Sequence, residues 1–79
     1  MKKGGSVMIT KITKLSIESN KIDVIEFHPF EYGLKMYNKI NYLDTFEITT
    51  TGFTYVCNRY NIIVQFIDDD LDLINDYHD

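Results

Sequence analysis

The chain has 79 residues, 44% of them hydrophobic, and a formal net charge of −4 at pH 7. A chain of this length forms one small domain and leaves little room for an enclosed substrate cavity, which disfavours an enzyme. Its single cysteine excludes an internal disulfide, and no apolar run approaches the ~18 residues that span a bilayer. We therefore expect a soluble protein of the cytoplasm that does not enter a membrane.

The first seven residues are set apart from the expected fold. Codons for residues 2–5 can contain a bacterial ribosome-binding sequence, and Met8 follows at a suitable spacing. We interpret residues 1–7 as a flexible leader or a misassigned start, and residues 8–67 as the β-rich domain. This interpretation places the gene in a bacterium or its phage.

β-Branched residues separated by turn signals predict a single β-rich domain, with an antiparallel sheet of about five to six strands. A slip in the alternation at Thr13–Lys14 requires a bulge or burial on both faces. The last strand is apolar on both faces apart from Gln65, which indicates a strand that is central in the sheet or sandwiched between two layers. The predicted strands outside residues 30–43 are 7–18, 22–27, 46–50, 53–57 and 62–67.

Residues 30–43 fit two structures. A helix starting near Pro29 aligns Phe30, Leu34 and Tyr37 on one stripe. Gly33 and the asparagines weigh against that helix, and a hairpin turning at Asn38–Lys39 is the interpretation that we favour. The alternative is an α+β fold with a helix near residues 30–43.

The acidic C-terminal segment, residues 68–79, holds half of the chain's twelve acids and no Lys or Arg. Asp68 has the character of a helix N-cap, and Leu71, Ile74 and Tyr77 then fall near one face of a short helix. The segment is predicted to be either this short C-terminal helix or a frayed tail. Its carboxylates are Asp68, Asp69, Asp70, Asp72, Asp76 and Asp79.

Metal and catalytic motifs are weak. Asp68, Asp70 and Asp72 match the D-x-D-x-D start of a calcium loop, but Leu73 and Asp79 stand where that loop needs Gly and Glu. We predict neither a metal nor a cofactor.

Cys57 and His28 offer a nucleophile and a base for catalysis. Cys57, however, alternates with Phe53 and Tyr55, which predicts a small buried hydrophobe instead. We predict no catalytic residues.

Aromatic and lysine side chains offer a surface for single-stranded nucleic acid, because bases stack on aromatic rings and lysines hold phosphates. The net charge of −4 opposes this reading, since nucleic-acid-binding domains carry a positive excess. We therefore expect no direct contact with nucleic acid, and assign most of the aromatic rings to the core.

The sequence predicts a small acidic binding or inhibitor protein that occludes a basic surface on a partner protein. A surface that binds nucleic acid is one candidate for that basic surface. In size, charge and lack of catalytic motifs, the chain is similar in profile to phage inhibitors of host defence or host enzymes. The alternative is a non-catalytic structural subunit that homo-oligomerises through strand edges. The predicted partner-binding residues are Asp68, Asp69, Asp70, Asp72, Asp76, Asp79 and Tyr77.

Overall fold

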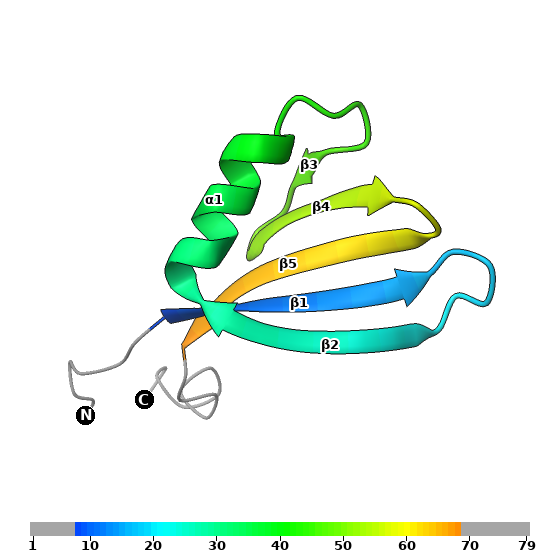
Figure 1. The fold of residues 1–79 in the computed structure, drawn as a ribbon, viewed down its shortest axis with the longest axis horizontal. Coiled ribbons are helices and arrows are strands. Elements are labelled where there is room, and N and C mark those ends of the chain that lie inside the picture. The colour runs from blue at the N-terminus through cyan, green and yellow to red at the C-terminus, as the bar shows by residue number, and fades with distance from the viewer. Residues whose placement is uncertain (1–7, 69–79) are drawn as a thin grey trace.

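The computed structural model describes residues 8–68, which form a five-stranded antiparallel sheet and one helix (Figure 1). The strand order is β2-β1-β5-β4-β3, and every pairing is antiparallel. The β-rich class predicted from the sequence is confirmed. The elements are β1 (Met8–Ser16), β2 (Ile22–Pro29), α1 (Phe30–Ile40), β3 (Glu47–Ile48), β4 (Gly52–Cys57) and β5 (Tyr60–Asp68).

Two tight turns join the long strands. Asn20, between β1 and β2, has φ 59°, and Asn58, between β4 and β5, has φ 58°. Asparagine tolerates this left-handed region better than other non-glycine residues, because its short side chain bonds locally. Both asparagines lie in gaps between the strands predicted from the sequence, at residues 19–21 and 58–61.

Of the two alternatives for the first strand, two-sided burial is the one observed: β1 pairs with β5 without interruption, so Ile12 lies on one face and Leu15 on the other. A bulge lies on the neighbouring strand, in the β1–β2 ladder. Lys14 pairs with Val24 but Leu15 pairs with Ile22, so Asp23 is an extra residue on β2. A bulge of this kind bends the strand and increases its local twist.

Strand β5 is the central strand of the sheet, as its two apolar faces predicted. It pairs with β1 from Met8↔Asp68 to Ser16↔Tyr60 and with β4 on its other side. Asp68 is the last residue of this strand. The helix that it was predicted to cap lies outside the described residues, so that role stays a prediction.

The prediction of a hairpin in residues 30–43 is wrong, because residues 30–40 form α1. Pro29 fixes the entry to the helix with φ −60° and makes no side-chain cap. Thr10 on β1 supplies the missing cap: its Oγ1 accepts from Gly33 N at 3.2 Å and donates to Phe30 O at 3.2 Å. This fully buried hydroxyl therefore bonds to one N–H and one C=O of the first helical turn and ties the start of α1 to β1.

Helix α1 packs on one face of the sheet, at the end where β2 and β5 finish (Figure 1). The core beneath it consists of Ile12, Phe53, Ile62 and Val64. Aromatic rings of Tyr37, Phe46, Tyr55 and Phe66 surround Phe53, with centroid distances of 5.4 to 6.5 Å. In residues 8–68, no helix is long and apolar enough to cross a membrane.

Candidate functional site

Of the predicted partner-binding residues, the structure describes Asp68. It lies half-buried at the end of β5, opposite Met8 of β1. The other predicted residues, Asp69, Asp70, Asp72, Asp76, Tyr77 and Asp79, lie outside the described residues, as does the predicted C-terminal helix.

The folded body carries no net charge that would offset the charge of the acidic segment. Residues 8–67 hold six Lys/Arg and six Asp/Glu, so this part of the chain is neutral. Backbone bonds from Ser16 to Lys21 and from Ile17 to Arg59 place two of the cations at the far end of the sheet. Eight strand residues separate that end from Asp68, about 26 Å, which is well beyond the screening length of about 8 Å at physiological salt.

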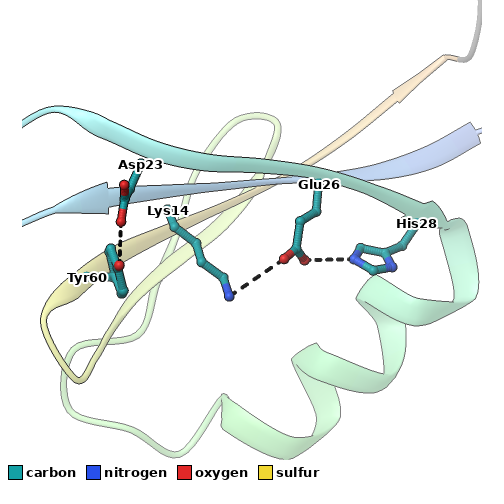
Figure 2. A network of polar contacts seen from close by, with 5 residues as sticks. All are labelled: Lys14, Asp23, Glu26, His28 and Tyr60. Carbon is teal, nitrogen blue, oxygen red and sulfur yellow. Dashed lines mark hydrogen bonds and ion pairs between the residues drawn. The ribbon is translucent and has the colours of Figure 1, made fainter.

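A row of polar side chains joins β1 and β2 on the face of the sheet that α1 covers (Figure 2). Glu26 lies between Lys14 and His28: its Oε1 is 2.9 Å from His28 Nε2, and its Oε2 is 3.7 Å from Lys14 Nζ. The His28 ring stacks on Tyr32 of α1 with a centroid distance of 4.0 Å. The row therefore fixes the edge strand β2 to its neighbour and to the helix.

We expect the hydrogen bond from His28 to control the ionisation of Glu26. That bond, followed by the charge of Lys14, holds the pKa of Glu26 below its ordinary value of 4.5. His28→Ala should therefore raise the pKa of Glu26 more than Lys14→Ala does, measured by NMR titration of the carboxyl carbon. An equal effect of the two substitutions, or none, would contradict this order.

The lowered pKa determines how the contribution of Glu26 to the free energy of unfolding changes with pH. The contribution of Glu26 is present above the pKa of the unfolded chain and is lost as the pH falls through the folded pKa. Because the group is well exposed and screened, we expect it to be no more than a few tenths of a kcal/mol. For a measurement of this contribution by substitution of Glu26, Glu47→Gln is the matched control, because it also removes a carboxylate from the surface.

A second polar contact closes the other end of the sheet. The Tyr60 hydroxyl donates to Asp23 Oδ2 at 2.5 Å, which raises the pKa of Tyr60 (Figure 2). Because Asp23 is the bulged residue of β2, this bond reaches across β1 and ties β2 to β5. Its role is structural.

Cys57 and His28 do not form a catalytic pair. Cys57 is level with Ser16 of β1 across the sheet, and His28 is level with Thr10 of the same strand. The two side chains are therefore six residues apart along the strands and three strand spacings apart across them. Strand geometry converts this offset to about 25 Å.

The prediction that Cys57 is buried is wrong, since its side chain is exposed. Burial decreases along β4, from Phe53 through Tyr55 to Cys57, because the cover provided by α1 and its loop ends before the last residue. Within residues 8–68, no three His, Cys, Asp or Glu side chains gather as metal ligands.

The largest feature that the sequence analysis missed is the second face of the sheet, which no other part of residues 8–68 covers. Phe27 and Ile22 on this face are 56% and 58% exposed. We call this surface the open face. Its apolar residues, assigned from the strand register, are Ile9, Leu15, Ile22, Ile25, Phe27, Val56, Ile63 and Ile67, with Lys11, Thr13 and Gln65 between them.

An open face of this composition is unusual. Antiparallel sheets with one solvated face normally alternate apolar and polar residues, whereas β1, β2 and β5 carry apolar residues on both faces. The two-sided pattern of residues 62–67 was the signal for it in the sequence. The open face therefore has the properties of an interaction surface.

Comparisons with protein-family models, with curated proteins and with solved structures found no match for this chain.

Proposed function

We propose that the protein is a non-catalytic binding protein that occludes a basic surface on a partner protein, with the carboxylates of residues 68–79 as its charged contact. The observation that supports this proposal is the separation of charge. A neutral folded body continues, from the end of its central strand, into a segment with six Asp and no Lys or Arg.

The chemistry of the segment defines the kind of partner. Clustered carboxylates accept hydrogen bonds from Arg and Lys and accelerate encounter with a basic surface. Basic surfaces of this kind occur on proteins that hold nucleic acid. A bacterial defence protein or host enzyme is therefore the partner class that we propose, and a phage or mobile element is the proposed source of the gene.

Affinity capture from a bacterial lysate tests the proposal. The full chain is compared with a variant in which all six aspartates of residues 68–79 become asparagine, which preserves length and apolar residues. We expect a partner that the full chain retains at low salt, that is lost at high salt, and that the variant does not bind. Recovery of the same proteins by both chains would contradict the proposal.

A second candidate function is a structural subunit that homo-oligomerises through strand edges. The observation in its favour is β2, an eight-residue edge strand that pairs on one side with β1. Amide hydrogen exchange distinguishes the two states. In an edge-paired oligomer all central β2 amides are protected, whereas at an unpaired edge alternate amides exchange quickly.

A further inference from the structure

We propose that the open face is the interface with a second copy of this chain. Two sheets would pack face to face as a sandwich, with α1 of each copy on the outside. This proposal goes beyond the proposed function, since it concerns the free protein and does not depend on the acidic segment.

The size of the open face matches what a stable dimer needs. Four strands spaced about 4.8 Å apart and about 27 Å long present a projected area of about 500 Å², to which protruding side chains add. A standard interface buries about 800 Å² on each partner. The open face is therefore of the right order for a complete interface.

The small core explains why a second copy is the occupant. Four apolar side chains in residues 8–68 are no more than 4% exposed: Ile12, Phe53, Ile62 and Val64. A core of this size stabilises a small domain only marginally, and oligomerisation is a common remedy. Another copy of the chain is always present at the protein's own concentration, so it completes the core without a second gene product.

The strand register indicates how two open faces fit together. Residues that pair across neighbouring strands form a row that runs across the sheet. A two-fold axis parallel to the strands, between β1 and β5, places each row of one copy over the same row of the other copy. The order of the strands is reversed, so β1 lies over β5 and β2 over β4. Phe27 then lies over Gly52 of the second copy, and Thr13 over Ile63. In these two rows a large side chain opposes a small one, and the strand directions of the two sheets are aligned within the roughly 30° of packed sandwiches.

Lys11 is the charged residue of the open face, and this arrangement gives it a polar partner. It shares a row with Phe27 and Gln65, so the axis sets it against Gln65 of the second copy. Gln65 Nε2 donates to Thr51 Oγ1 at 3.4 Å, which leaves the Gln65 carbonyl oxygen as an acceptor. The Lys11 ammonium can donate to that oxygen while its aliphatic stem packs on the apolar residues.

Sedimentation equilibrium of the full chain tests the dimer, which should have twice the monomer mass of 9.3 kDa at micromolar concentration. Phe27→Glu should raise the dissociation constant by about a hundredfold or more, because each dimer carries the change twice. The new carboxylate lies directly opposite Lys11 on β1, so the monomer should remain folded by far-UV circular dichroism. Tyr42→Glu, at a position 76% exposed in the loop after α1, is the matched control and should leave the dimer intact.

A cross-link separates face pairing from edge pairing. In a Cys57→Ser background, Ile63→Cys places a thiol on the central strand, and a short bismaleimide should join two copies through it. In a dimer paired through the β2 edges the two thiols lie five strand spacings apart, about 24 Å, and the same reagent leaves the chains separate. A monomeric full chain, a dimer that survives Phe27→Glu, or absence of the cross-link would each overturn the proposal. Dimerisation seen only after residues 69–79 are removed would also overturn it, and would identify that segment as the cover.

Discussion

Replacing Phe53 by alanine is expected to lower the free energy of unfolding by about 3 to 5 kcal/mol. Phe53 is 1% exposed, and four aromatic rings surround it. Removing the ring leaves a cavity that neighbours on α1, β4 and β5 cannot fill by small movements. Because a domain of this length has a total stability of about 4 to 12 kcal/mol, the variant should lose a large part of it.

Urea denaturation followed by circular dichroism measures the change. Tyr42→Ala is the control, since that ring is 76% exposed and its loss should change the stability by no more than about 0.5 kcal/mol. A loss below 1 kcal/mol for Phe53→Ala would contradict the position of Phe53 at the centre of the core.

Gly33→Ala is expected to destabilise the protein by about 1 to 3 kcal/mol, although alanine is the better helix former. A Cβ at this position would lie 2.5 Å from Phe66 Cε1 and 2.6 Å from Thr10 Oγ1. Thr10 is fully buried and bonded to the helix, so it cannot move away without breaking the bonds to Phe30 O and Gly33 N. The helix would have to lift off the sheet.

The same urea measurement tests this substitution, with Asn38→Ala as the matched control. Asn38 is an exposed position of α1, where alanine should stabilise by a few tenths of a kcal/mol through its helix propensity. The double variant Gly33→Ala/Phe66→Leu should lose less stability than the sum of the single changes, because the shorter side chain makes room for the Cβ. Stabilisation by Gly33→Ala would show that α1 does not approach the sheet as closely as described.

The strands could be predicted from the sequence because their signals are local. β-Branched residues and the two turn asparagines, Asn20 and Asn58, lie within the segments that they organise. Helix α1 was predicted only as the alternative to a hairpin, because Gly33 lowers helix propensity locally. The contact that requires a glycine there is with Thr10, 23 residues away. The hairpin was favoured because the residues around Gly33 carry no information about its contact with Thr10.

The candidate surfaces were less predictable than the fold. Alternation along β4 correctly placed Phe53, Tyr55 and Cys57 on one face, but it carries no information about where the helix ends, so the burial of Cys57 was wrong. The open face was missed for the same reason, because a pattern of apolar residues does not say which of two faces the helix covers. For the acidic segment, where the structure describes Asp68 alone, the predicted role stays a prediction.

The pairing of β1 with β5 has a consequence for synthesis of the protein. Met8 pairs with Asp68, so the two strands that form the middle of the sheet are among the first and last parts of the domain to be made. Until β5 has left the ribosome, the β1–β2 hairpin has no neighbour on its inner edge, and both Thr10 and Ile12 lack most of the core that buries them. Such non-local pairing slows folding and exposes the nascent chain to chaperones and proteases. We therefore expect the domain to fold only after translation of β5, as a single cooperative unit.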